Sequence, residues 1–240
     1  MEEEIKIFDE YVGNFDLKDE GILRKKEHSY RVMNFAKSIA ESLKLNETDI
    51  YIATLAGLVH DIGRFNQLKF YGTFKDSESI DHGDEGYRVL CDFIDNFTTD
   101  KEIQNIVLLA TKYHNKFKIG NVDDRTKMFC KIVRDADKLD IIETQINEVN
   151  SENIVIKDEL LKSIYKKETC KNDYCETEED AVLRMISWIF DLNFAYSYKY
   201  LKDNKIIERK FNVLKRTQDK QKLAELEEFV YREIEEMNLC

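Results

Sequence analysis

The sequence predicts an all-α protein, and three observations favour this fold class. The chain has no proline and only eight glycines, so few residues interrupt helices. Apolar residues recur at the i, i+3, i+4, i+7 spacing of one helical face. Hydrophobic residues make up 42% and charged residues 35% of the 240 residues, which indicates a folded core under a heavily charged surface.

The helical spacing is clearest in the first half of the chain. Over residues 24–45 the apolar face consists of Val32, Phe35, Ala36, Ile39 and Leu43. Helices are expected on the same grounds over residues 24–45, 48–59, 85–97, 99–114 and 125–147. The second is expected to stop near Gly63, and the fourth begins with the capping-box pattern Thr99-Asp100-Lys101-Glu102. The segment 66–84 is then the only long connection in this half.

The second half is expected to be helical as well. The charged stretch 154–180 predicts a short helix and a loop, and two long amphipathic helices follow near 180–202 and 206–237. Because there is no internal repeat, low-complexity tract or clear linker, we interpret residues 1–240 as a single domain. Its chemistry is expected in a core of about residues 20–145, followed by a helical extension of about residues 146–240.

The formal net charge of −11 limits the partners of the chain. Duplex nucleic acid is not expected, because phosphate neutralisation needs clustered lysine and arginine. A small anionic ligand remains compatible with this charge if a metal ion supplies the positive charge.

The chain is expected to be cytoplasmic. Its most apolar stretches, such as 50–59 and 181–194, are too short or too interrupted to span ~30 Å of hydrocarbon, so no membrane partner is expected. The N-terminus Met1-Glu2-Glu3-Glu4 is acidic where a secretory signal would be basic and then apolar. The five cysteines form no C-x-x-C pair, which favours a reduced protein over a disulfide or metal site at Cys170 and Cys175.

The placement of the four histidines points to chemistry. His28 lies one turn before Val32 on an apolar helical face, and His60 and His114 end apolar faces of the second and fourth helices. His82 lies in the turn-rich sequence Asp81-His82-Gly83-Asp84, at an expected helix start. One buried histidine is usually a satisfied core residue. Several converging histidines beside carboxylates are better explained by a divalent metal, which binds the neutral ring and offsets the carboxylate charge.

Carboxylates are available for such a site. Asp61 follows His60 directly, and the segment Arg134–Asp140 supplies three more. Helical phase leaves Asp135 and Asp137 as equal alternatives, because each lies about a quarter-turn off the apolar face, on opposite sides.

Together these residues form a recognisable pattern. His28, His60-Asp61 and Asp137 resemble the H…HD…D signature of the HD-domain superfamily of metal-dependent hydrolases. Residues 58–64, LVHDIGR, are similar to the HDIG(K/R) element of that family, and residues 136–140, ADKLD, are similar to its terminal AD(K/R)LD element. The resemblance covers about residues 24–142, selects Asp137 over Asp135, and implies an all-α core with the metal between its helices.

Binuclear members of this superfamily place two further histidines between the HD pair and the last aspartate. His82 and His114 stand in that order. By resemblance, one metal ion is held by His28, His60, Asp61 and Asp137, and a second by His82 and His114 with Asp61 bridging. The alternative is a single metal ion with His82 and His114 hydrogen-bonded to substrate. Iron, manganese, magnesium, nickel and cobalt are not distinguished.

The resemblance implies a phosphohydrolase that cleaves a phosphoester or phosphoanhydride of a nucleotide or other small phosphorylated molecule with metal-activated water. Two alternatives are an HD-type di-iron oxygenase, which uses the same six ligands, and a non-catalytic metal- or nucleotide-binding module. The C-terminal helices carry no recognised motif, so they are expected to cover the core or to form a homo-oligomer contact.

Other residues are expected near the substrate. Asp61 is expected to orient the attacking water as well as to bind metal. Arg64 lies one helical turn beyond His60 and is expected to bind substrate phosphate, as the basic residue at this position does in related families. Lys138 is a weaker phosphate-contact candidate. The connection 65–84 is expected to form part of the pocket wall, with contributions from Tyr71, Thr73, Phe74, Asp76, Ser77, Asn115 and Lys116.

Overall fold

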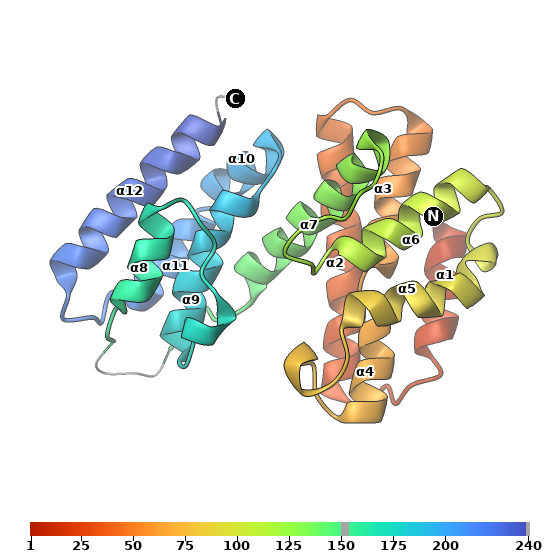
Figure 1. Cartoon of the computed structure of the whole chain (residues 1–240), viewed down its shortest axis with the longest axis horizontal. Helices are drawn as coiled ribbons and strands as arrows, with labels where there is room; N and C mark the ends of the chain where they lie inside the picture. Colours follow the sequence, from red (N-terminus) through yellow and green to blue (C-terminus); the bar gives the residue numbers. More distant parts are fainter. Residues whose placement is uncertain (150–153, 239–240) are drawn as a thin grey trace. The chain divides into compact units, whose positions relative to one another are not determined.

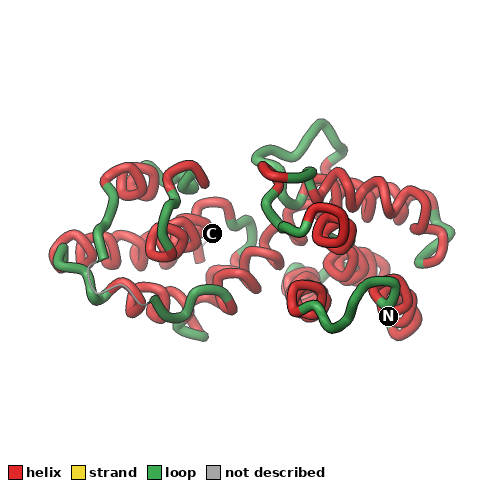
Figure 2. The backbone as a smooth tube through the Cα atoms, turned by 90° about the horizontal axis from the view of Figure 1, so that it is seen from below, coloured by secondary structure: helices red, strands yellow, loops and turns green. Residues whose placement is uncertain are grey.

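The predicted all-α fold class is confirmed. The computed structural model describes residues 1–149 and 154–238, and within them it contains helices and loops but no strand (Figure 2). The chain divides into two compact units, Met1–Asp140 and Ile141–Cys240. This boundary lies close to the expected limit of the core near residue 145. The interpretation of the whole chain as one domain stays a prediction.

The first unit is a bundle of helices from the N-terminus to most of α7 (Figure 1). Its helices are α1 (Glu2–Val12), α2 (Glu20–Ser42), α3 (Glu47–Val59), α4 (Gly63–Tyr71), α5 (His82–Phe93), α6 (Lys101–Tyr113) and α7 (Asp124–Thr144). Helix α2 packs against α3, α3 packs against α6, and α5 packs against both α4 and α6. The apolar face of α2 is buried as predicted except for Leu43, which is exposed because the helix ends at Ser42.

Side-chain caps set where several of these helices begin. Helix α2 starts earlier than predicted because the Asp19 carboxylate accepts hydrogen bonds from the backbone N–H groups of Gly21 and Ile22. The capping box predicted at Thr99 is wrong. Asp100 is the N-cap of α6 instead, and its carboxylate accepts hydrogen bonds from the backbone N–H groups of Glu102 and Ile103. Helix α1 was not predicted.

The expected loop over residues 66–84 is also wrong in part. Gly63 does not stop a helix but begins α4, and only residues 72–81 connect α4 to α5. That connection contains one 3₁₀ turn at Asp76–Glu78. His82 is the first residue of α5, as predicted.

Glycine permits a close crossing of α2 and α3. A Cβ atom on Gly57 would lie 2.9 Å from the Ala36 Cβ atom and 3.0 Å from the Val32 carbonyl oxygen. The absence of a side chain therefore lets the two backbones approach, just before the end of α3 where His60 and Asp61 follow.

In the second unit the two predicted long helices are each broken in two. The described helices are α8 (Asp158–Tyr165), α9 (Glu178–Ser187), α10 (Ala195–Asp203), α11 (Ile206–Leu214) and α12 (Lys220–Asn238). The short helix and loop predicted over 154–180 are present as α8 and the segment before α9. Within the described residues, no helix is long and apolar enough to cross a membrane.

Four of the five cysteines are free thiols, and Cys170 is buried while Cys175 is partly exposed. Cys240, the fifth, lies outside the described residues.

Candidate metal centre

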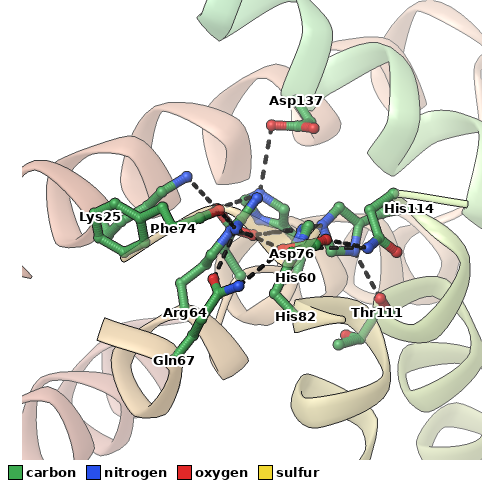
Figure 3. Close-up of polar contacts among 12 residues, drawn as sticks. Lys25, His60, Arg64, Gln67, Phe74, Asp76, His82, Thr111, His114 and Asp137 are labelled. Carbon is green, nitrogen blue, oxygen red and sulfur yellow. Dashed lines mark hydrogen bonds and ion pairs between the residues drawn. The ribbon is translucent and has the colours of Figure 1, made fainter. Parts of the chain in front are cut away.

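The first unit brings together the six side chains predicted to bind metal (Figure 3). They come from five helices or helix ends: His28 on α2, His60 and Asp61 after α3, His82 on α5, His114 after α6, and Asp137 on α7. The four histidines and Asp61 are buried. Figure 3 shows Asp137 reaching the cluster from α7.

The Nε2 atoms of the histidines face one another in two pairs. The Nε2 atoms of His28 and His60 are 3.2 Å apart, and those of His82 and His114 are 3.0 Å apart. The rings of His60 and His114 connect the pairs, with 5.0 Å between centroids. Two neutral imidazoles cannot hydrogen-bond to each other when both facing Nε2 atoms carry a lone pair and no hydrogen. A cation between the two nitrogens would be bound by both lone pairs, so this arrangement fits a cation site.

The other ring nitrogen of each histidine has an acceptor. The Nδ1 atoms lie 2.6–2.8 Å from oxygen atoms of four different residues: Gly57 O for His60, Thr111 O for His114, Asp140 Oδ2 for His28 and Asp76 Oδ2 for His82. A hydrogen on Nδ1 satisfies all four contacts and leaves the Nε2 lone pairs directed to the centre. Metal-binding histidines in proteins are oriented by this kind of contact.

The carboxylate of Asp61 is shared between the two histidine pairs. Its Oδ2 atom lies 3.4 Å from His28 Nε2 and 3.7 Å from His60 Nε2. Its Oδ1 atom lies 3.4 Å from His114 Nε2 and 3.5 Å from His82 Nε2. Each oxygen therefore faces a different pair, which is the placement that a bridging carboxylate needs.

Asp137 is the aspartate of α7 that joins this centre. Its Oδ1 atom lies 3.1 Å from His28 Nε2 and 3.7 Å from His60 Nε2. The ligand atoms of His28, His60 and Asp137 lie within 4.8 Å of one another, and so do those of His60, Asp61 and His114. A set of imidazole nitrogens and carboxylate oxygens suits divalent transition metals, so the residues fit the expected cofactor.

The pKa shifts leave His60, His82 and Asp61 in the protonation states that bind metal, whereas His28 is the exception because its pKa is raised. Burial lowers the pKa of His60, and it lowers the pKa of His82 to about 4, so both rings are neutral. Burial alone would raise the pKa of Asp61, but the charge of Lys25, together with hydrogen bonds from His114 and His28, more than offsets burial and holds that pKa well below its usual range. Burial also opposes a charge on His28, yet hydrogen bonds to Asp137, Asp140 and Asp61 raise its pKa to about 10.

Arg64 lies beside the centre, on the first turn of α4. Its Nη1 atom donates to Gln67 Oε1, to the Phe74 carbonyl oxygen and to Asp76 Oδ1, at 2.6–3.0 Å. Its Nε atom is buried without a hydrogen-bond partner and lies 3.6 Å from Asp61 Oδ1. The guanidinium is thus fixed through Nη1, while Nε is left with an unsatisfied hydrogen.

Lys138 follows Asp137 on α7, and its ammonium lies 3.5 Å from the Arg134 carbonyl oxygen one turn earlier. Its contact with substrate stays a prediction.

Three further residues of the centre were not assigned their roles from the sequence. Lys25 donates to Asp61 Oδ2 at 2.7 Å, and it lies one helical turn before His28, a spacing that could have revealed it. Asp140 orients His28 and is itself bound by Arg31. It lies three residues after Asp137 on the same helix. Asp76 was expected only as part of a pocket wall.

The connection between α4 and α5 contacts the centre mainly through Asp76. Besides His82 and Arg64, its carboxylate accepts hydrogen bonds from Gln67 Nε2 at 2.9 Å and from Asn115 Nδ2 at 3.3 Å. Lys116 pairs with Asp81 and Asp84 at 2.6–2.7 Å. Asp76 therefore links α4, the start of α5 and the segment after α6.

Comparison with known proteins agrees with this geometry. Residues 26–142 match the family described as HD domain, and searches of curated proteins and of solved structures each found no match. The matched residues include all six converging side chains and Asp140. Through residues 26–142, the chain is therefore a member of the HD-domain superfamily.

Proposed function

We propose that the chain is a metal-dependent phosphohydrolase that holds two divalent metal ions. It would cleave a phosphoester or phosphoanhydride of a nucleotide or another small phosphorylated molecule. The observation that carries this proposal is the Asp61 carboxylate, whose two oxygen atoms face two separate histidine pairs.

Each proposed metal position has its own residues. His28, His60, Asp137 and Asp61 Oδ2 would hold the first ion, and His82, His114 and Asp61 Oδ1 would hold the second. When bound, two divalent ions would lower the pKa of a water molecule and offset the charge that develops on the reacting phosphate. The chain orients the imidazoles through their Nδ1 contacts and keeps Asp61 ionised through Lys25.

Positive side chains beside Asp61 support an anionic substrate. Lys25 and Arg64 both contact this carboxylate, and the unsatisfied Nε–H of Arg64 is a donor for a phosphate oxygen. We propose Asp61 and Arg64 as catalytic residues, and Arg64 and Lys138 as substrate contacts. In the reaction, the water oxygen bonds to phosphorus as the P–O bond to the leaving group breaks. The leaving oxygen keeps that electron pair, and the proton lost by the water passes to the solvent or to the leaving oxygen.

Metal content per chain is the first test. Protein purified without chelator and without oxygen should contain close to two metal ions by elemental analysis, and it should release phosphate from phosphate esters or anhydrides. His60→Ala should lose metal and activity. Arg64→Ala should keep its metal but raise KM for the phosphate substrate, by about tenfold for one charge-assisted hydrogen bond.

Other results would change the proposal. A content of one metal ion per chain would indicate that His82 and His114 contact the substrate instead of a second metal ion. Consumption of oxygen without phosphate release would indicate a di-iron oxygenase instead. A chain that stays free of metal after reconstitution would exclude the enzyme and leave a binding module.

A further inference from the structure

Three positively charged side chains surround the ring of Phe74 near the candidate metal centre. The Arg24 Cζ atom lies 5.6 Å, the Lys25 Nζ atom 5.7 Å and the Arg64 Cζ atom 5.9 Å from the ring centroid. Figure 3 shows Lys25, Phe74 and Arg64 next to one another. Within the described residues, no carboxylate lies within ion-pair distance of Arg24, and its side chain is exposed.

The arrangement is not a simple consequence of helix geometry. Arg24 and Lys25 are consecutive on α2, and neighbouring residues of a helix point about 100° apart. Both reach the same ring because Phe74, on the connection after α4, lies between them and Arg64 of α4. In a chain with a net charge of −11, three like charges gathered around one side chain are an arrangement that an anion would stabilise.

Carboxylates of the chain neutralise this group only in part. Lys25 and Arg64 share Asp61, which is also the carboxylate between the two proposed metal positions. Arg64 has a second partner in Asp76, which in turn binds His82. The charge of Arg24 and the buried Nε–H of Arg64 are both left for a ligand.

We propose that Arg24, Lys25 and Arg64, arranged around Phe74, bind a second phosphate group of the substrate. The substrate would then be a phosphoanhydride with two or more linked phosphates rather than a phosphate monoester. Lys25 and Arg64 lie beside Asp61, so the second phosphate would bind next to the reacting one, and the exposed Arg24 adds a third charge at the same ring. This inference rests on the proposed function, because it extends the same site.

Binding of two inorganic probes tests the inference. Calorimetric titrations of the metal-loaded chain, in buffer with excess loading metal, would compare phosphate with imidodiphosphate, a non-hydrolysable pair of linked phosphates. The wild-type chain should bind imidodiphosphate at least about tenfold more tightly, as expected for one further charge-assisted contact. Arg24→Gln should remove most of this preference and leave phosphate binding within about twofold. Arg24→Lys should retain part of it.

Arg232→Gln is the matched control. Arg232 is also an exposed arginine stacked on a phenylalanine, with its Cζ atom 5.4 Å from the Phe229 ring, but it lies in the second unit. Its replacement should change neither titration. Because Arg24 is exposed, Arg24→Gln should keep the melting temperature of the wild type.

The outcomes separate this inference from the proposed function. Equal affinities for the two probes, or an equal loss of both in Arg24→Gln, would overturn the second-phosphate site. Hydrolysis of monoesters alone would do the same while the phosphohydrolase proposal stands. Arg24-dependent binding of imidodiphosphate without turnover of any phosphate compound would support the site and contradict the hydrolase.

Discussion

His28 is the residue of the centre whose proton a bound metal ion would have to displace. It lies among the carboxylates of Asp61, Asp137 and Asp140, and their hydrogen bonds outweigh burial and raise its pKa to about 10. In the metal-free protein the charged ring stabilises the fold. Because the folded pKa exceeds the usual 6.5, this stabilisation is complete below pH 6.5 and is lost as pH rises towards 10.

We therefore expect the free energy of unfolding of the chelated protein to fall between about pH 6.5 and 10, by up to about 1.4 kcal/mol per pH unit from this group. Urea unfolding at several pH values, compared with His28→Gln, isolates the contribution. Metal uptake should release a proton in the same range, measurable by calorimetry in buffers of different ionisation enthalpy. Parallel pH profiles of the two proteins would contradict a charged His28.

Asp76 and Asp140 orient histidines of different pairs. Asp140 is buried and binds His28, whereas Asp76 is about one-third exposed and binds His82. Replacing an outer carboxylate of this kind typically weakens metal binding 10–100-fold. In metal titrations, Asp76→Asn should therefore weaken binding at the second metal position, which contains His82, and leave binding at the first position unchanged. Asp140→Asn should weaken binding at the first position, which contains His28, and leave the second unchanged.

Asp81→Asn is the control for Asp76→Asn. Asp81 lies on the same connection and caps α5 through the Asp84 N–H, a role that asparagine also fills. This variant should bind both metal equivalents like the wild type. If Asp76→Asn also does so, Asp76 does not position His82.

The sequence was sufficient to predict which six side chains converge, but not what orients them. His28, His60, Asp61, His82, His114 and Asp137 could be found because their types and order form a pattern. The acceptors of their Nδ1 atoms include two backbone carbonyl oxygens, and a carbonyl has no residue type to recognise. Asp76 lies on a connection whose path only the folded chain reveals.

At the scale of helices, Gly63 fixes the distance between α4 and α5. A Cβ atom at this position would lie 2.4 Å from the His82 carbonyl oxygen and 2.5 Å from the Gly86 nitrogen, both of them backbone atoms. Gly63→Ala should therefore push α5 away and move His82. We expect a loss of about 1–3 kcal/mol in unfolding free energy and a weaker second metal equivalent.

Gly13→Ala is the matched control, since Gly13 has φ −60° and a Cβ atom there would meet no atom closer than 3.3 Å. It should change stability by well under 1 kcal/mol and leave metal binding intact. If Gly63→Ala binds metal with the same affinities as the wild type, then α4 and α5 can separate without moving His82.

Lys210 holds the end of α7 within the second unit. From α11 its buried ammonium donates to the carbonyl oxygens of Gln145 and Ile146 and, at 3.1 Å, to Asn147 Oδ1. Lys210→Met keeps the apolar stem but leaves these acceptors without their donor, which should cost about 1–3 kcal/mol in unfolding free energy. Urea unfolding measures this loss, and Lys199→Met, at an exposed i,i+4 pair, should have little effect.

The breaks in the second unit show where helix prediction from sequence failed. With no proline in the chain, the apolar periodicity continues through each break, so two long helices were predicted. The interruptions occur instead at short polar residues that bond to nearby backbone: the Asn193 side chain donates to the Asp191 carbonyl oxygen, and the Thr217 hydroxyl accepts from the Asp219 N–H. Such residues also occur inside helices, so their presence alone does not predict a break.

For the whole molecule, the location of all the proposed ligands in one unit makes it possible to test whether the two units unfold as a single domain. All six proposed ligands lie in the first unit, so metal bound by them would stabilise that unit directly. At a metal concentration 100 times Kd the gain is about 2.7 kcal/mol. Helix α7 runs from Asp124 to Thr144 without interruption and passes the boundary between the units at residue 140. Because both units share this helix, we expect them to unfold together.

The single tryptophan makes this expectation measurable. Trp188 lies in the second unit, after α9, so its fluorescence reports on the unit that holds none of the proposed ligands. If the chain is one cooperative domain, adding metal should raise the Trp188 unfolding midpoint as much as the midpoint from circular dichroism. His60→Ala should abolish both shifts, which shows that they arise from the centre. A circular-dichroism shift with an unchanged Trp188 midpoint would mean that the units unfold independently, since stabilisation confined to one unit cannot delay the unfolding of another unless their transitions are coupled.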